Sequence, residues 1–541
     1  MTSTLERVPL GELDPRAEHV MVAMRDGVRL ATDVYPPSGR GRHPAVLVRL
    51  PYDKSARFSF MTSIAPMFQE RGYAFVAQDV RGKARSEGEA HAFIHEVADG
   101  GDTLDWIASQ PWSNGVVGMF GDSYYGFTQW AAAASGHPSL RAIVPRVTTT
   151  EIGTDWMYHQ GVFCLYTMVE WAAQTWVDSA LYDGVPDFSV RPLADVVPAA
   201  QGGRRSPSLD RWRSTPPDGA FWTEGIFGVR DPLARVSIPV LHSGGWWDVF
   251  QRGQLRDHAR LAGRPAQHLV MGSTDHFDDE LAEGDEPVED ILVSEEALAR
   301  FLPVYVAPAL SFFDRYLLGR DDAVDRVRWH LANAGWRAAD RWPPAGAHEL
   351  VLHAAGDPTS ADGGALAAVP DAGRRGAAWT HDPADPVPDA VVDAWRPLLA
   401  LPDERRAGER ADVVSFTSEP IGELDLAGPV RVEGATGEAD GGGTLAATLL
   451  DVSPDGRARR MLQGAAVPSR DGFSIDLGDT GYRLGSGHRL RLNLSASLHP
   501  RYLADCGTET DPWLETGPPR RRAVAIGGTE GLRLRVTALG R

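Results

Sequence analysis

The stretch Gly115–Ala134, GVVGMFGDSYYGFTQWAAAA, decides the fold. It opens with a short apolar run typical of a buried parallel strand, turns sharply at Gly121–Gly126, and continues into a segment rich in helix formers. A strand, a tight turn and a helix with a serine at the apex form a nucleophile elbow. Ser123 occupies that apex, and the flanking glycines let the strand and helix backbones pass closely. The stretch therefore predicts a parallel sheet that presents Ser123 at its edge.

The elbow departs from a strict G-x-S-x-G, because Tyr125 stands where the second glycine would be and Gly126 follows it. A Gly-Asp-Ser turn before an Ala-rich helix also occurs as a plain structural feature, so the motif alone leaves both interpretations open. A serine hydroxyl is a poor nucleophile unless a base takes its proton. The catalytic interpretation therefore requires a histidine and an acid later in the chain.

Length and composition limit the class of protein. A chain of 541 residues is too long for one core and predicts two or three domains. The hydrophobic fraction of 43% is that of a soluble globular protein. The net charge of −19 argues against nucleic acid and anionic membrane surfaces as partners, and its simplest role is solubility. The two cysteines are far apart, and no apolar run predicts a signal peptide or a membrane span, so we expect a cytoplasmic protein.

Strands alternate with helices on both sides of the elbow. Apolar runs predict strands over residues 45–50, 73–77, 116–120, 142–144, 238–243 and 268–272, and helices over 65–72, 100–110 and 307–318. This alternation predicts an α/β class with a parallel sheet, formed by residues 1–145 and 231–326, with helices on both faces. An Asp26-Gly27 turn predicts a hairpin over residues 20–35. Between the two parts, residues 146–230 are rich in aromatics at helical spacing and predict a helical cap.

The last part of the chain has a different pattern. Residues 327–541 contain short β-like runs separated by turn signals such as Gly441–Gly443, which predict a β-sandwich or jelly roll. The stretch Gly356–Gly376 is rich in Ala, Gly and Asp and predicts a surface loop. We find no internal repeat.

Two further residues complete a constellation with Ser123. Asp248 follows the predicted strand 238–243, and His276 follows the predicted strand 268–272. Because the carboxyl ends of parallel strands meet at one edge of a sheet, we expect the three side chains to come together there. The chain order Ser, Asp, His is the one that α/β-hydrolases use. Each residue alone is compatible with a structural role, as a cap or a loop residue, whereas the ordered set favours catalysis.

Other residues compete for these roles. The alternative bases are His137, His242 and His258. His242 lies inside a predicted strand and His258 inside a predicted helix, so we expect both to be structural. The carboxylates Asp275, Asp278 and Asp279 invite a metal interpretation, but no second histidine stands at ligand spacing and we expect no metal. The chain has neither a Walker A sequence nor a G-x-G-x-x-G after a strand, so we expect no nucleotide or other cofactor.

Acyl transfer also needs hydrogen-bond donors for the developing oxyanion. In an elbow the backbone N–H after the nucleophile supplies one, and here that residue is Tyr124. The loop after strand 45–50 has no HGGG-type turn, but it contains Tyr52, whose phenol can donate. A tyrosine packed at a strand end beside Pro51 is the structural alternative for Tyr52.

Ordered motifs over nearly the whole chain resemble the cocaine-esterase-like serine hydrolases, which are related to X-prolyl dipeptidyl peptidases and α-amino-acid ester hydrolases. The matching segments are RDGVRL (25–30), PYDK (51–54), QDVRG (78–82), QPWSNG (110–115), the elbow at 121–126, Trp247-Asp248, FFDRY (312–316), FTSEP (416–420) and GHRLRL (487–492). The resemblance implies an α/β-hydrolase domain with a helical cap, followed by a C-terminal jelly roll.

The resemblance also implies roles for single residues. Ser123 is the expected nucleophile, His276 its base and Asp248 the acid that orients the base, with Tyr52 and the Tyr124 N–H as the oxyanion hole. In the esterase branch, the positions that contact the acyl group match Trp156, Trp171 and Phe250, and Trp247 beside the acid is assigned to the same substrate pocket.

Two departures from the family pattern affect the substrate. Ser273-Thr274-Asp275 precede His276, where the family usually has an aromatic and a small polar residue. Val249–Arg252 follow Asp248, where amino-ester hydrolases carry carboxylates for a substrate ammonium. A neutral or apolar acyl group therefore fits better.

The sequence favours a serine hydrolase that cleaves small-molecule carboxylic esters through an acyl-enzyme. The alternatives with the same triad are an acyltransferase, a lactone-forming enzyme and an amidase or X-Pro-type peptidase. A non-catalytic binding protein with a vestigial triad is a rival of another class, and the complete Ser-His-Asp set argues against it. No sequence feature decides whether the chain forms a homodimer.

Overall fold

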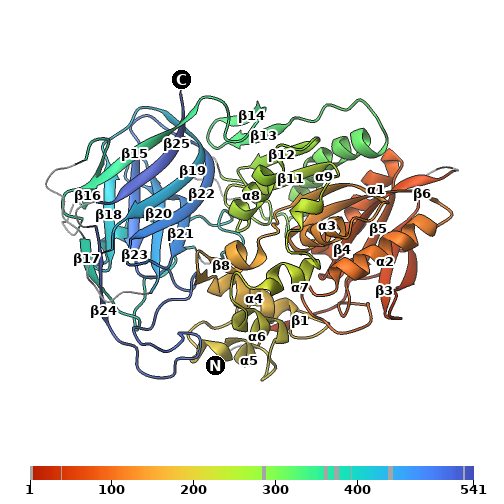
Figure 1. The fold of residues 1–541 in the computed structure, drawn as a ribbon, viewed down its shortest axis with the longest axis horizontal. Helices are drawn as coiled ribbons and strands as arrows, with labels where there is room; N and C mark the ends of the chain where they lie inside the picture. Colours follow the sequence, from red (N-terminus) through yellow and green to blue (C-terminus); the bar gives the residue numbers. More distant parts are fainter. Residues whose placement is uncertain are drawn as a thin grey trace.

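The computed structural model describes residues 4–37, 39, 41–282, 288–358, 363–370, 377–391, 393–436, 443–527 and 531–540. Two large sheets lie side by side along the long axis of the molecule, and a group of short helices lies against both of them (Figure 1). The first sheet carries the elbow, so its construction determines where the candidate site lies.

The first sheet has ten strands in the order β14-β13-β12-β11-β7-β6-β4-β5-β3-β2. The strands from β13 to β5 in this order are parallel, and β2, β3 and β14 are antiparallel additions at the two edges. Their bounds are β2 Glu18–Ala23, β3 Arg29–Tyr35, β4 His43–Leu50, β5 Ala74–Asp79, β6 Ser113–Asp122, β7 Leu140–Arg146, β11 Val240–Gly245, β12 Gln267–Gly272, β13 Val327–Leu331 and β14 Gly335–Ala339.

Burial explains why these runs form central strands. Seven of the eight residues of β4 and all six of β5 are buried, as expected for parallel strands covered on both faces. The edge strand β2 is mostly exposed and pairs with β3 across the Asp26-Gly27 turn. The predicted hairpin and the predicted parallel sheet are therefore both present.

Helices cover the two faces of this sheet (Figure 1). They are α1 Met61–Arg71, α2 Glu96–Ser109, α3 Ser123–Ser135, α8 Gln251–Leu261 and α9 Glu295–Leu317. The predicted start of the last helix at residue 307 is too late, because Ser294 caps α9 by accepting a hydrogen bond from the Ala297 N–H at 3.1 Å.

Helix α9 is also long and apolar enough to cross a membrane, by length and composition, which the sequence analysis did not expect. Its inner face packs on the sheet. A Cβ atom added to Gly118 on β6 would lie 2.7 Å from the Phe313 ring and 2.8 Å from Leu317. This close approach is the packing of a core helix.

The cap lies between the two halves of the first sheet in the chain. It contains a π-helical turn at Ile152–Met157 and the helices α4 Leu165–Thr175, α5 Val196–Ala200, α6 Pro207–Ser214 and α7 Glu224–Phe227. Two small ribbons accompany them, β8 Tyr158–His159 with β9 Val162–Phe163, and β10 Leu181–Asp183 with β1 Glu6–Val8. Most of the cap aromatics pack into one buried cluster with residues of α2 and α3.

The C-terminal part is a β domain. Its nine-stranded sheet has the order β21-β20-β23-β18-β16-β15-β25-β19-β22, and the end strands β21 and β22 contact each other. Its strands are β15 Ala347–Ala355, β16 Gly364–Ala367, β18 Val413–Ser418, β19 Leu424–Gly434, β20 Leu445–Val452, β21 Ala458–Ala466, β22 Phe473–Leu484, β23 Arg489–Ser495 and β25 Arg533–Leu539, and β17 Ala377–His381 pairs separately with β24 Arg522–Ile526. Burial alternates strictly along β25, so its apolar side chains face the domain core.

The structure differs from the sequence analysis in two places here. Strands β13 and β14, which lie within the predicted last domain of residues 327–541, hydrogen-bond to the first sheet, because β13 continues the parallel ladder beside β12. Strand β16 lies inside the predicted surface loop 356–376, where it pairs in parallel with β18. Residues 359–362 and 371–376 of that loop, and 441 and 442 of the predicted glycine turn, lie outside the described residues.

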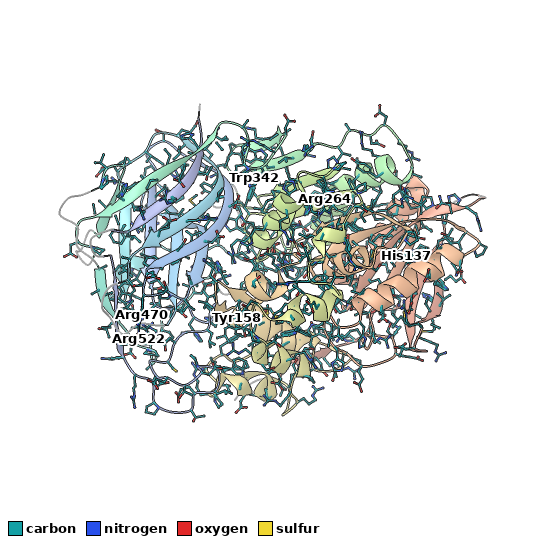
Figure 2. The ribbon with its side chains drawn as sticks, viewed as in Figure 1. His137, Tyr158, Arg264, Trp342, Arg470 and Arg522 are labelled. Carbon is teal, nitrogen blue, oxygen red and sulfur yellow. The ribbon has the colours of Figure 1, made fainter. Side chains whose placement is uncertain are left out.

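Aromatic packing joins the β domain to the first sheet. The Trp342 ring lies between the two sheets (Figure 2), 4.9 Å from Trp246 and 5.2 Å from Trp329, measured between ring centroids. Its indole N–H donates to the Asp479 carboxylate at 2.7 Å. Trp246 comes shortly before Asp248, so this contact fixes the loop that carries the predicted acid.

Candidate active site

The elbow has the strained backbone that its role requires. Strand β6 ends immediately before Ser123, and Ser123 itself has φ 55°, a conformation that costs energy for any residue other than glycine. Gly121 has φ 138°, and a Cβ atom there would lie 2.1 Å from the Tyr125 ring. A Cβ atom on Gly126 would lie 2.5 Å from Thr148. Both glycines are therefore required by close approach, even though the second is displaced by one position.

Tyr52 lies against the serine. Its hydroxyl interacts with the Ser123 side chain and accepts the indole N–H of Trp171 at 3.0 Å. Burial raises the pKa of Tyr52 to about 12, so the phenol keeps its proton at neutral pH and remains a donor. Tyr124 is the second residue of α3, where a backbone N–H has no partner within the helix. Two donors therefore lie beside Ser123.

The other two residues of the predicted triad form a direct pair. The Nδ1 atom of His276 lies 2.7 Å from Oδ1 of Asp248, and both side chains are almost completely buried. This contact fixes the imidazole so that Nδ1 carries the proton and Nε2 is free to act as a base. The loops after β11 and β12 thus bring together what the sequence predicted there.

A chain of aromatic contacts links the histidine to the serine. The Phe250 ring lies 5.4 Å from the His276 ring and stacks on Trp156 at 4.7 Å. Trp156 in turn lies 5.1 Å from Trp171, which binds the Tyr52 hydroxyl. Three predicted pocket residues, Trp156, Trp171 and Phe250, therefore lie together between the Asp–His pair and Tyr52. The wall that they form is apolar.

One residue of this wall was missed by the sequence analysis. The Trp395 ring lies 4.9 Å from the His276 ring, and the Trp395 carbonyl accepts the backbone N–H of His276 at 3.3 Å. Trp395 comes from the connection between β17 and β18, where it is surrounded by Asp and Pro and has no periodic pattern. No local signal in the sequence places it against a loop more than a hundred residues earlier.

Trp395 is held from the cap by Glu170. The Trp395 indole N–H donates to Glu170 Oε2 at 2.7 Å, and the Tyr166 hydroxyl donates to Oε1 at 3.1 Å. Burial and the nearby Asp393 raise the pKa of Glu170 to about 8. The cap and the connection between β17 and β18 thus meet at one buried acid.

Replacement of Glu170 by glutamine is expected to remove a pH dependence of stability. The folded pKa lies above the unfolded value of 4.5, so the folded state binds more protons and wild-type stability falls as pH rises from 4.5 to about 8. A folded pKa that is one pH unit above the unfolded pKa changes the free energy of unfolding by about 1.4 kcal/mol over that range. In thermal melts, the melting temperature of Glu170→Gln is expected to be higher than that of the wild type at pH 9, but not at pH 5. The exposed Glu224→Gln is the control, and equal pH profiles for wild type and Glu170→Gln would contradict the assignment.

A buried ion cluster connects the elbow to the histidine loop. Arg146 at the end of β7 donates to Asp122 at 2.8 Å and to both oxygens of Asp278 at 2.8 and 2.9 Å. Asp122 precedes the serine and also accepts the Tyr305 hydroxyl at 2.9 Å. Burial raises the pKa of Asp278 to about 6, although Arg146 pulls in the opposite direction. Arg146 therefore ties the residue before Ser123 to the residue two places after His276.

The other carboxylates of the histidine loop have protein partners. Asp275 accepts the backbone N–H groups of Phe277 and Leu398, each at 3.1 Å. Asp279 accepts two hydrogen bonds from Arg396, at 2.7 and 2.9 Å. Over the part of the chain that the structure describes, no group of three or more His, Cys, Asp or Glu side chains is arranged to hold a metal ion.

The alternative bases lie elsewhere. His137 follows the far end of α3 (Figure 2), about 20 Å from its first residue at 1.5 Å per residue, and it bonds Asp105. His242 is fully buried in β11, and burial lowers its pKa well below the usual value. His258 is buried in α8, and burial lowers its pKa to about 4.

Trp247 and Ser273, which the sequence places near the site, contact the β domain and strand β13. The Trp247 indole N–H donates to the Arg460 carbonyl at 3.3 Å, and its ring belongs to the buried cluster of the β domain. Ser273, in the departure before the histidine, lies 2.8 Å from Nδ1 of His330 on β13. Both contacts anchor loops of the site to structure outside the apolar wall.

Comparisons with known proteins agree with this architecture. Residues 26–278 match the family model described as X-Pro dipeptidyl-peptidase (S15 family), and residues 322–534 match the X-Pro dipeptidyl-peptidase C-terminal non-catalytic domain. Cocaine esterase from Rhodococcus sp. (strain MB1 Bresler) is 30% identical over 534 residues, covering 90% of this chain and 91% of that protein.

Solved structures show the same fold. An aminopeptidase from a marine sediment Thaumarchaeota archaeon has a TM-score of 0.79 at 23% identity, covering 98% of this chain and 99% of that one. An α-amino acid ester hydrolase has a TM-score of 0.78 at 24% identity and covers 98% of each chain. The resemblance found in the sequence is confirmed: the chain belongs to the S15 family of X-Pro dipeptidyl-peptidases and related esterases, and its first part has the α/β-hydrolase fold.

Proposed function

We propose that this protein is a serine hydrolase that cleaves carboxylic esters through an acyl-enzyme formed on Ser123. The observation that carries the proposal is the 2.7 Å contact between His276 and Asp248, together with the interaction of the Tyr52 hydroxyl with the Ser123 side chain. These contacts supply a nucleophile, an oriented base and an oxyanion donor on one edge of the sheet.

In the proposed reaction, the Ser123 oxygen attacks the ester carbonyl while Nε2 of His276 takes its proton. Asp248 keeps the proton on Nδ1 and stabilises the imidazolium that forms. The oxyanion accepts hydrogen bonds from the Tyr52 hydroxyl and the Tyr124 N–H. When the carbonyl re-forms, the alcohol leaves with the proton from His276. A water molecule, activated by the same histidine, then releases the acid and restores the serine.

The wall of the site indicates the acyl group. Trp156, Trp171 and Phe250 form an apolar surface, and Trp395 extends it over the histidine. Glu170 lies behind Trp395 rather than on that surface, and its raised pKa favours the neutral acid at pH 7. These features support a neutral, aromatic or branched acyl group. We also propose that the C-terminal sheet, which contributes Trp395 through its connecting loop, is a jelly roll.

A panel of substrates tests the proposal. We expect neutral aryl and alkyl esters to be hydrolysed with higher kcat/KM than X-Pro dipeptide amides of matched leaving-group pKa. The X-Pro peptidase is the second candidate, because the matching family model bears that description. Faster cleavage of the dipeptide amides would overturn the esterase proposal in its favour, and acyl transfer to an added alcohol in place of hydrolysis would identify an acyltransferase.

Replacement of Tyr52 by phenylalanine is expected to lower kcat by about 10²- to 10³-fold, the usual cost of losing one oxyanion donor. Phenylalanine keeps the edge contact of the ring with Tyr125 at 6.2 Å, so KM is expected to change little. Tyr35→Phe is the control, because it removes a buried phenol of the same sheet whose hydroxyl donates to Asp14. A variant with unchanged kcat would show that Tyr52 does not serve the oxyanion.

A further inference from the structure

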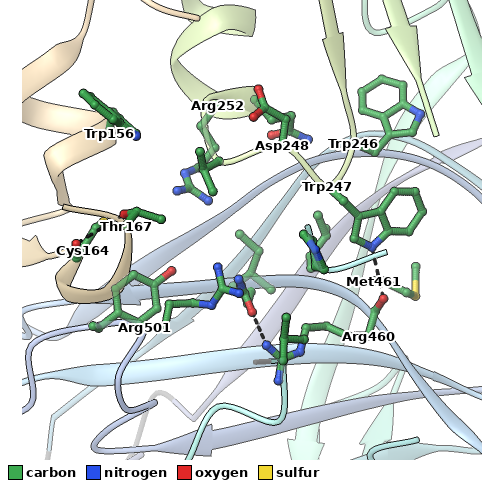
Figure 3. A pocket seen from close by; sticks show the side chains of 18 of the residues that line it. Trp156, Cys164, Thr167, Trp246, Trp247, Asp248, Arg252, Arg460, Met461 and Arg501 are labelled. Carbon is green, nitrogen blue, oxygen red and sulfur yellow. Dashed lines mark hydrogen bonds between the residues drawn. The ribbon is translucent and has the colours of Figure 1, made fainter. Parts of the chain in front are cut away.

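A cavity of about 70 Å³ lies where the cap, the first sheet and the β domain meet (Figure 3). Asp248 forms part of its wall, whereas Ser123, His276 and Tyr52 do not. Much of the remaining lining is apolar, including Trp156, Trp247 and Met461. The cavity therefore lies apart from Ser123, His276 and Tyr52. It shares Trp156 with the apolar wall of the proposed acyl pocket, and Asp248 and Trp247, the latter predicted for the substrate pocket, also line it.

The arginine Arg252 enters this cavity from α8 with an unused donor. Its side chain is 14% exposed, and its buried Nε atom has no hydrogen-bond partner among the residues that the structure describes. Its ion-pair partner is Asp155, at 3.5 Å from Nε. Asp155 is held more closely by Arg256, so it serves two cations at once. Arg252 is thus a buried cation whose Nε–H has no hydrogen-bond acceptor among the described residues.

A second arginine, Arg501, lines the same cavity from the β domain. Its Nε atom donates to Asp389 at 2.5 Å, while Nη2 is buried without a partner among the described residues. Asp389 also accepts a hydrogen bond from Arg460 at 2.6 Å. Like Arg252, Arg501 shares its carboxylate with another arginine. Buried charged donors are rarely left unpaired in proteins, so these two invite an acceptor from outside the chain.

The two guanidinium groups line the same cavity (Figure 3). Both act electrostatically on the Cys164 thiol and the Tyr502 phenol, which also line the cavity. Burial raises the pKa of Cys164 to about 11 and that of Tyr502 to about 12, so neither becomes an anion at neutral pH. These two lining groups therefore supply no acceptor charge for the space between Arg252 and Arg501.

We propose that this cavity is a second binding site, which takes a small monocarboxylate held by Arg252 and Arg501. A carboxylate matches the planar fork of a guanidinium, and an aliphatic tail suits the apolar part of the lining. The volume corresponds to about five water molecules, which limits the ligand to about five non-hydrogen atoms. Propionate has that size. The site does not depend on the proposed esterase activity, although such acids are of the class that ester hydrolysis releases.

Titration calorimetry with sodium propionate tests the site on the wild-type chain without substrate. We expect saturable binding, at least tenfold weaker binding to Arg252→Met, and unchanged binding to Arg230→Met, which alters an exposed arginine of the cap. Propionamide, the neutral isostere, is expected to bind at least tenfold more weakly than propionate. Chloride at equal ionic strength controls for a general effect of anions.

Two further measurements keep the test decisive. Cys164→Leu fills the cavity without altering a guanidinium, and its side chain makes no capping bond to α4, so loss of binding is expected in this variant as well. Binding is expected to survive phosphonate labelling of the serine, which blocks the acyl pocket. Equal binding by wild type and both cavity variants, or loss of binding on labelling alone, would place propionate in the acyl pocket and overturn the proposal. No binding by the wild type would mean that the cavity holds only water.

Discussion

Replacement of Ser123 by alanine is expected to lower kcat for ester hydrolysis by about 10⁴- to 10⁶-fold, because no other hydroxyl occupies the apex of the elbow. The loss is expected in kcat and not in KM, since the aromatic wall that binds the acyl group is untouched. The measurement is steady-state turnover of the best ester in the panel, with the folded state checked by thermal melting.

Ser135→Ala is the matched control. It removes a serine from the opposite end of α3, where the hydroxyl donates to the Ala132 carbonyl at 2.6 Å. Its turnover is expected to equal that of the wild type. Removal of Ser123 also relieves no φ strain, because alanine has the same Cβ restriction at φ 55°. Turnover that survives in Ser123→Ala would assign the nucleophile to another residue.

Replacement of Asp248 by asparagine is expected to lower kcat by about 10⁴-fold while the protein stays folded. Asparagine has the same shape, but its amide N–H₂ turned toward Nδ1 would favour the tautomer with the proton on Nε2. That nitrogen could then no longer accept the serine proton. The pH profile of kcat separates this effect from a structural one. A histidine in the wrong tautomer changes the pH dependence of the residual activity, whereas a loss of folded protein lowers kcat without changing that dependence.

Asp257→Asn provides a matched comparison for this variant. Asp257 is an equally buried acid on α8 that accepts hydrogen bonds from Thr149 and Thr150. Burial raises the pKa of Asp257 to about 7, so a large part of this acid is already uncharged near neutral pH. We expect little change in kcat. A similar loss in both variants would mean that Asp248 acts through stability and not through His276.

The sequence predicted the edge of the sheet well, for a physical reason. Ser123, Asp248 and His276 each follow a mostly buried strand that contains a short apolar run, and such strands belong in a parallel sheet whose carboxyl ends share one edge. Tyr52 was found in the same way, from its place after β4. Local pattern and global topology agree at these positions, so the pattern alone was enough.

Contacts made by irregular segments were not predictable in this way. Trp395 lies in a connection without periodicity, and only the packing of the β domain against the first sheet brings it onto His276. The partners Glu170 and Arg146 are also set by tertiary packing, since each joins elements far apart in the chain. The sequence places β13 and β14 in the last domain, because the sequence of a short strand does not indicate which sheet the strand will join.

The most direct test of the central claim is the intact mass of the protein after treatment with a serine-directed phosphonate, followed by peptide mapping. A nucleophile activated by His276 is expected to give one adduct per chain, located on Ser123, and no adduct on Ser123→Ala. Absence of labelling on the wild type, or labelling of a different residue, would contradict an acyl-enzyme at this elbow.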